Sequence, residues 1–305
     1  MTGIDAVRLH FSPESLVALD LILAFVLFGV ALDIKVADFR RVVTAPRGTV
    51  IGLVAHSLLL PAVAWLLTMV LKPEPSIALG MILVASCPSG NISNFLVNYA
   101  RGNTALSVTI AAFSMLGSIL FTPFNLAFWG GLNPETRPIL QAVALSPWQV
   151  FGAVIMLLGV PTTLGVWVSH RYPGFAARAR RPFQVLSLVF FVLFVVGALV
   201  VNWDFFLQYT HRVLLFVFLL NAFALATGYF TAKLARLPEG DRRAVSLEVG
   251  IQNSGFGLAL VFNFFGGLGG MAIVAAWWGI WHLLAGLTIS TWWRRHPPAT
   301  AGALA

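Results

Sequence analysis

The sequence consists largely of long apolar runs that are separated by short polar or basic stretches. About nine of these runs reach the roughly 20 residues that an α-helix needs to cross the hydrocarbon core of a bilayer. They lie at about 15–33, 48–71, 76–100, 104–130, 148–170, 182–201, 213–233, 244–266 and 270–293. The pattern predicts an all-α polytopic membrane protein in which no polar stretch is long enough to form a separate soluble domain.

Two of the runs, the third and the eighth, are interrupted by polar and helix-breaking residues. The third contains Pro88 and Gly90 within a polar stretch at 86–94, and the eighth contains the carboxylate of Glu248 among amides and glycines at 246–255. Such residues are tolerated inside a span only where protein or water satisfies the freed backbone groups. An ionisable group at that depth is costly and marks a candidate functional site. Each run is therefore predicted to break into two half-helices.

The positions of the two interrupted runs predict an internal repeat. They are five spans apart, so they cross the membrane in opposite directions. The first four spans, about 15–130, then correspond to the last four, about 182–293, as inverted repeats, and the span at about 148–170 is unpaired. Interrupted spans in matching places of two halves indicate the binding site of a transporter. We expect one integral membrane domain, 1–305, whose two broken helices cross at the midplane.

Composition and charge support this class and exclude others. The chain is 59% hydrophobic and 10% charged, with a mean hydropathy of +0.88. Its net charge of +8 does not indicate nucleic acid, because the basic residues mark helix ends rather than a basic surface patch. Of the 19 Lys and Arg residues, only Arg8, Lys72, Arg137 and Arg212 fall on one side. Basic loops face the cytoplasm, which predicts an inner-membrane protein with its N-terminus outside and its C-terminus in the cytoplasm.

Several local features carry smaller expectations. The first apolar run has no basic start before it and is predicted to be retained as a span rather than cleaved as a signal peptide. Pro61 is expected to kink its helix, because it lacks a backbone N–H. The basic run from Arg171 to Arg181 is interpreted as a cytoplasmic loop. Trp277, Trp278 and Trp281 are interpreted as bulky aromatic side chains that face the lipid.

The two breaks suggest how a cation and an anion could be bound together. The first half of the eighth span is expected to end in unpaired carbonyl groups at Val249, Gly250 and Ile251, which suit a hard cation such as sodium. Glu248 adds a full negative charge beside them. The free N–H groups of the second half-helices, after Asn91 and Asn253, suit an anion. Asn221, in the seventh span, is interpreted as a residue that forms a packing hydrogen bond.

Five stretches of the chain resemble the bile acid:sodium symporter family, including its bacterial members. The most specific is Glu248 to Gly255, together with its partner break at Cys87-Pro88 to Asn103. The others are Phe28-Gly29 to Phe39-Arg40, Ala105 to Val108, and Trp281-His282. The resemblance covers nearly the whole chain. It implies a core domain that contains the crossed helices, a panel domain that moves against it, and alternating access.

The resemblance also implies residues for the coupling ion, Na⁺, and for the substrate, a small organic anion. No organic cofactor or obligate protein partner is expected. The implied first sodium site comprises Ser93, Asn94, Ser107 and Glu248. The implied second site comprises Glu248, the carbonyls of Val249 and Ile251, Gln252, and His56. The substrate anion would meet Asn91, Asn253, Ser254 and His282.

Two positions depart from the family pattern. His56 stands where the bacterial members have a glutamine, and Ala111 stands where they have a threonine, with Thr109 pointing elsewhere on the helix. An imidazole is a poorer ligand for sodium than an amide oxygen. We hypothesise that His56 weakens the second site, allows a proton to replace sodium there, or has only a structural role.

Other functions remain open on the sequence. The chain could be a proton-coupled or passive carrier or channel for organic anions. A more remote alternative is a membrane-embedded enzyme that uses His56, Glu248 and His282 around a metal ion. Bile salts, steroid conjugates, pantoate-like acids and 2-oxo acids are all compatible with the apolar residues that would line a pocket.

Overall fold

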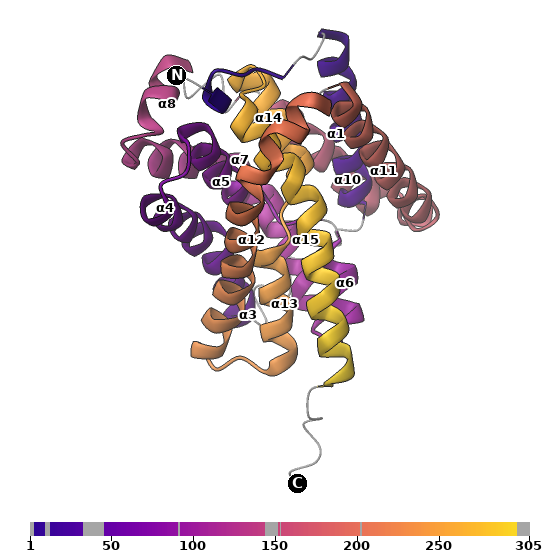
Figure 1. Cartoon of the computed structure of the whole chain (residues 1–305). Coiled ribbons are helices and arrows are strands. Elements are labelled where there is room, and N and C mark those ends of the chain that lie inside the picture. Colours follow the sequence, from indigo (N-terminus) through magenta and orange to yellow (C-terminus); the bar gives the residue numbers. More distant parts are fainter. Residues whose placement is uncertain are drawn as a thin grey trace.

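The computed structural model describes residues 3–9, 13–32, 46–90, 92–143, 152, 154–201 and 203–297. These residues form helices and no strand (Figure 1). The helices are η1 Gly3–Asp5, α1 Pro13–Ala31, α3 Pro46–Val54, η2 Ala55–Leu59, α4 Leu60–Leu71, α5 Pro75–Ser86, α6 Ser93–Tyr99, α7 Thr104–Leu132, α8 Arg137–Val143, η3 Ile155–Gly159, α10 Val160–Arg171, α11 Pro173–Val201, α12 Trp203–Leu234, α13 Glu239–Gly250, α14 Ser254–Phe265 and α15 Gly269–Arg295.

The described part of the chain has the helices of a multi-pass membrane protein. Five ranges are long and apolar enough to cross a bilayer: Glu14–Ala31, Pro46–Leu71, Thr104–Leu132, Leu207–Leu234 and Gly269–Arg295. They coincide with the first, second, fourth, seventh and ninth predicted spans. The fifth, 148–170, lies partly outside the described residues.

The basic run at 171–181, predicted to be a loop, is largely helical. Helix α11 begins at Pro173 and continues through this run. Its alanines and arginines favour a helix, and proline is well suited to the first helical turn. The loop prediction is therefore wrong for residues 173–181.

Both predicted helix breaks are present, and they pair with each other. Residues 87–92 separate α5 from α6, and residues 251–253 separate α13 from α14. The two segments form an antiparallel bridge between Ser89 and Gln252. Gly90 N donates to Ile251 O at 2.8 Å, and Asn253 N donates to Pro88 O at 2.8 Å. Backbone groups that one break frees are thus satisfied by the other, as an apolar environment requires.

Glycine suits the close contact between the two breaks. A side-chain Cβ at Gly90 would lie 3.0 Å from Gln252 O and 3.1 Å from Ile251 Cγ2. These contacts are tight for any side chain, so Gly90 allows the two backbones to approach closely.

A π-helical turn lies directly before Pro61, where the sequence predicts a kink. The π-helical turn η2 precedes it and joins α3 to α4 with helical backbone on both sides. Because Pro61 has no N–H, the carbonyl of Ser57 loses its usual helical donor. Asn125 of α7 donates to that carbonyl at 2.8 Å instead. A second π-helical turn, η3, precedes Pro161 in the same way.

The helices fall into two packing groups. Helix α1 packs chiefly against α10 and α11, while α5, α7, α12, α13 and α15 pack around the two breaks (Figure 1). The N-terminal segment at 3–9 belongs to the second group. Its Asp5 Oδ1 accepts from Ser76 N at the start of α5 at 2.8 Å, and Val7 O accepts from Gly269 N at 2.9 Å. Helix α15, with 27 residues, then extends about 40 Å away from this segment.

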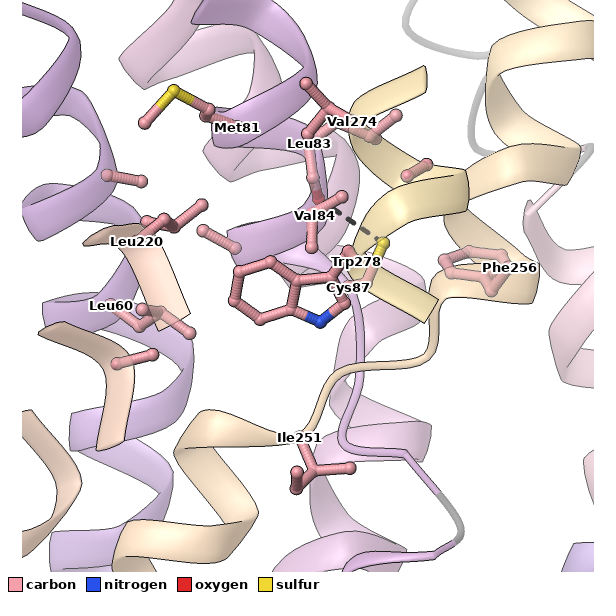
Figure 2. Close-up of a cluster of buried hydrophobic side chains, with 14 of the residues drawn as sticks. Leu60, Met81, Leu83, Val84, Cys87, Leu220, Ile251, Phe256, Val274 and Trp278 are labelled. Atoms are coloured by element: carbon pink, nitrogen blue, oxygen red, sulfur yellow. Dashed lines mark hydrogen bonds between the residues drawn. The ribbon is translucent and has the colours of Figure 1, made fainter. Parts of the chain in front are cut away.

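Buried apolar side chains surround the breaks (Figure 2). Trp278 of α15 and Cys87 lie beside the end of α5, close to Phe256 of α14. Cys87 Sγ donates to Leu83 O at 3.3 Å. Trp278 has no exposed surface, so its assignment to the lipid-facing surface is wrong. It belongs to the packing core.

Candidate functional site

Glu248 occupies the centre of the contact between the two broken helices. It lies in the last turn of α13 and has no exposed surface. Its Oε2 accepts a short hydrogen bond from Ser89 Oγ in the first break, and its Oε1 accepts one from Ser107 Oγ of α7. A carboxylate buried in this way depends on its hydrogen bonds and on any nearby positive charge.

The serine hydroxyls around this carboxylate have more oxygen neighbours than protons to donate. Ser107 Oγ also lies 2.7 Å from Asn94 Oδ1 of α6. Ser89 Oγ lies 3.4 Å from Ser93 Oγ and 3.4 Å from Ile251 O. Each hydroxyl has a single proton to donate. The oxygen cluster comprises Ser89, Ser93, Asn94, Ser107, Glu248 and Ile251 O. Ser107 Oγ has one proton for two close acceptors, Glu248 Oε1 and Asn94 Oδ1, so this proton cannot bridge both contacts.

Ser89 is a member that the sequence analysis did not select. Its backbone N donates to Ser114 Oγ of α7 at 3.2 Å, which holds the residue in the break. The four residues predicted for the first sodium site, Ser93, Asn94, Ser107 and Glu248, lie in the same cluster. Only the pairing of the two breaks brings Ser89 against Glu248, and that pairing cannot be read from either segment alone.

A second polar group adjoins the oxygen cluster. Gln252 is fully buried, and its Nε2 donates to Val249 O at 2.8 Å. His56 lies on η2, which packs against α13. Gln252 Oε1 and His56 Nε2 are buried and have no hydrogen-bond partner among the described residues. A carbonyl oxygen and an imidazole nitrogen are thus available for a ligand.

The carbonyl groups at the end of α13 are not unpaired, contrary to the prediction. Asn221 Nδ2 of α12 donates to Gly250 O at 2.7 Å, as expected for a packing residue. Gly90 N donates to Ile251 O, and Gln252 donates to Val249 O. A carbonyl oxygen has two lone pairs, so each group can still accept one further ligand.

Two of the residues predicted for substrate binding, Asn253 and Ser254, lie at the second break. Asn91 is outside the described residues. Asn253 caps α14, since its Oδ1 accepts from Phe256 N at 3.1 Å, and Ser254 begins that helix. His282 of α15 is buried, and its ring lies 6.2 Å from that of Trp278 in an edge-on contact. Asn253 Nδ2, His282 Nδ1 and Trp278 Nε1 are buried without a hydrogen-bond partner among the described residues.

Thr109 does not replace the hydroxyl that Ala111 lacks. Its Oγ1 donates to Ala105 O in its own helix at 2.9 Å. The hydroxyl is therefore committed to the α7 backbone, as its position on the helix predicts.

The described residues do not form the metal centre of the enzyme alternative. They contain no group of three or more His, Cys, Asp or Glu side chains that could hold a metal ion. His56, Glu248 and His282 are therefore not gathered around one point.

Comparison with known proteins agrees with this geometry. The Sodium Bile acid symporter family matches residues 20–209. YocS of Bacillus subtilis (strain 168), described as an uncharacterized sodium-dependent transporter, is 30% identical over 273 residues, which cover 90% of this chain and 82% of YocS. The probable sodium/metabolite cotransporter BASS2, chloroplastic, of Oryza sativa subsp. japonica is 29% identical over 244 residues, 80% of this chain and 56% of that protein.

An animal protein is also similar over most of the chain. The ileal sodium/bile acid cotransporter of Homo sapiens is 24% identical over 237 residues, which cover 77% of this chain and 66% of the human protein. All three relatives are named as transporters or cotransporters rather than enzymes. The family model matches more than half of this chain. The chain therefore belongs to the sodium bile acid symporter family of membrane transporters.

Proposed function

We propose that this chain is a secondary active transporter that carries a small organic anion across the cell membrane together with sodium ions. Sodium-coupled transport is supported by the family and by the names of its relatives. The observation that carries the proposal is the fully buried carboxylate of Glu248, held by neutral hydroxyls where two broken helices meet. A buried charge with neutral partners is strongly stabilised by a counter-ion.

The oxygen cluster has the chemistry of a sodium site. Hard cations prefer carboxylate, hydroxyl and carbonyl oxygens, and the cluster offers all three from Glu248, Ser107 and Ile251 O. The oxygens of Ser107, Asn94 and Glu248 share one hydroxyl proton, and the pair that it does not bridge repels unless a positive charge lies nearby. We therefore assign Ser89, Ser93, Asn94, Ser107 and Glu248 to the first site.

A second sodium ion would use the adjoining group. The candidate ligands are Glu248, the carbonyls of Val249 and Ile251, Gln252 Oε1, and His56 Nε2. Two of these, Gln252 Oε1 and His56 Nε2, are buried acceptor or donor atoms without a partner among the described residues. The nitrogen of His56 is the ligand least suited to sodium.

Proton coupling is a second candidate function, and the same observation favours it. A proton on Glu248 would supply the hydrogen that Ser107 and Asn94 lack between their oxygens, which lie 2.7 Å apart. Sodium and a proton would therefore relieve the same repulsion. Only a measurement of ion dependence distinguishes them.

For the substrate, we propose a small or amphipathic organic anion that binds at the start of α14. The N-terminus of this 12-residue helix carries partial positive charge. Asn253 Nδ2 and His282 Nδ1 are nitrogen atoms that still need a partner. Asn91 and Ser254 complete the proposed set. Bile salts, steroid conjugates, pantoate-like acids and 2-oxo acids are the candidate classes.

The proposed mechanism is alternating access by movement of a panel domain against a core domain, in a nine-span chain with inverted repeats at 15–130 and 182–293 and an unpaired span at 148–170. The group formed by α1, α10 and α11 would be the moving panel, and the helices around the breaks would be the core. The preference of α1 for α10 and α11 supports this division. The proposed orientation has the N-terminus outside and the C-terminus in the cytoplasm of the inner membrane.

Uptake into proteoliposomes tests the function. Labelled organic anions of each candidate class are supplied outside, with an inward gradient of sodium, potassium or protons. The proposal expects accumulation above the external concentration with the sodium gradient alone. Accumulation that follows only the proton gradient would support the second candidate, and simple equilibration under every gradient would identify a passive carrier or channel.

A further inference from the structure

Arg243 joins the ends of three helices through buried hydrogen bonds. It lies on α13 and is only 3% exposed. One terminal nitrogen donates to Ala100 O, just after α6, and to Trp293 O in the last turn of α15, both at 3.0 Å. The other donates to His296 O at 2.7 Å, and Nε donates to Glu239 Oε1 at 3.0 Å. We call these five residues the Arg243 junction.

Helix α7 is attached to the same end of α13. Asn103 N donates to Gly240 O at 2.9 Å, and Asn103 Nδ2 donates to Asp241 Oδ1 at 2.8 Å. The same Asn103 caps α7 by accepting from Leu106 N at 3.1 Å. A Cβ added at Gly102 would lie 3.2 Å from Gly240 O. The α6–α7 connection and α13 therefore lie in close backbone contact and are joined by two hydrogen bonds.

The helices that meet at this junction are those that carry the oxygen cluster. Glu248 follows Arg243 by five residues on α13, Asn94 precedes Ala100 by six on α6, and Ser107 follows Asn103 by four at the start of α7. At 1.5 Å per residue, each oxygen-bearing residue is about 6–9 Å along its helix from the junction. Short helical segments are stiff, so a displacement at one end reaches the other.

We propose that Arg243 is a positioning residue for cation binding, which sets the distances between Glu248 and the oxygens of α6 and α7. This inference rests on the proposed function, since it concerns the same sodium site. Ligands of an ion must be held to within about 0.5 Å. The junction supplies that restraint from outside the cluster and touches none of its oxygen atoms.

Arginine is suited to this role by its shape. Its planar guanidinium offers five N–H groups in fixed directions, whereas lysine is a single mobile point charge. The carbonyls at helix C-termini carry partial negative charge, which stabilises the buried cation together with Glu239. Lysine keeps the charge, but its single nitrogen cannot replace the separate nitrogens that contact Ala100 O and Trp293 O, His296 O, and Glu239.

The test compares Arg243→Gln and Arg243→Lys with a matched control, Arg242→Gln. Arg242 is the neighbour on α13; it lies 3.6 Å from Glu239 and donates to Leu237 O at 2.7 Å. Thermal unfolding of the purified protein is followed in a sodium titration, with potassium keeping ionic strength constant. Loss of a residue that orients metal ligands weakens metal affinity by about tenfold or more. We expect such a rise in the half-saturating sodium concentration for both Arg243 variants, with full response at saturation, and a change within about twofold for the partly exposed control Arg242→Gln.

The outcomes separate positioning from simple stabilisation. If Arg243→Gln lowers the unfolding midpoint but keeps the wild-type half-saturation, the residue only stabilises the fold and the inference is overturned. If neither Arg243 variant folds, Asn103→Ser decides, because serine still caps α7 but loses the bond to Asp241. Its half-saturation should rise, and an unchanged value would overturn the inference. A wild-type protein without any sodium response would overturn the proposed function and this inference with it.

Discussion

Replacement of Glu248 by glutamine keeps the size of the side chain but removes its charge. Glu248 has no exposed surface, and its hydrogen bonds come from the neutral hydroxyls of Ser89 and Ser107. Two opposite unit charges about 4 Å apart attract each other by about 4 kcal/mol at an effective dielectric constant of about 20. Since 1.4 kcal/mol corresponds to a factor of ten, Glu248→Gln should weaken sodium binding by about a thousandfold.

The sodium-free protein should respond in the opposite direction. A buried carboxylate without a counter-ion destabilises the folded state, so Glu248→Gln should unfold in potassium at the wild-type temperature or above it. In sodium the wild type should gain about 2.7 kcal/mol once the ion is at a hundred times its dissociation constant. At the same concentration the variant should gain almost nothing.

Differential scanning fluorimetry in sodium and potassium measures both effects. The control is Glu74→Gln, which removes a partly exposed carboxylate that pairs with Arg212 at 3.1 Å and should keep the full sodium response. A Glu248→Gln protein that retains the wild-type sodium shift would refute the reasoning and remove Glu248 from the cation site.

Two further predictions concern neutral residues around the breaks. Ser89→Ala removes a hydroxyl that contacts the buried carboxylate and should raise the half-saturating sodium concentration about tenfold in the same titration. The control is Ser86→Ala, because the Ser86 hydroxyl donates within α5 at 2.7 Å; this variant should leave the half-saturating sodium concentration unchanged. Equal effects of the two variants would count against a specific role of Ser89. Asn221→Leu leaves Gly250 O without its side-chain donor and should cost about 1–3 kcal/mol in denaturant unfolding, whereas a neutral effect would show that the carbonyl finds another donor.

The helix breaks were predictable because polar and helix-breaking residues stand out within long apolar runs. In an apolar run, Pro88, Gly90 and Glu248 are costly unless the backbone opens or a ligand binds. The sequence also contains the oxygen ligands as residue types, since serines and asparagines cluster at the two interruptions. Local chemistry was enough to identify most of the cluster.

Long-range pairing could not be predicted in the same way. Ser89 became a partner of Glu248 only through the antiparallel register of two segments about 160 positions apart. Asn125 and Asp5 satisfy backbone groups of distant helices, and nothing near them in the sequence indicates those partners. Helix propensity also prevailed over charge at 173–181, where a basic run continues a helix instead of forming a loop.

The shared backbone of the two breaks gives a physical reason for coupling between ion and anion. Ile251 O belongs to the oxygen cluster, and Asn253, two residues later, caps α14 at the proposed anion site. An ion that fixes Ile251 also orders this N-terminus, so an anion would bind a helix end that is already in place. We expect each ligand to tighten the other by the same factor, in the range of about 5–150-fold. Thermal-shift titrations of one ligand at fixed levels of the other measure both factors. Glu248→Gln should reduce both coupling factors to one. Anion affinity that does not depend on sodium in the wild type would show that the two sites are independent.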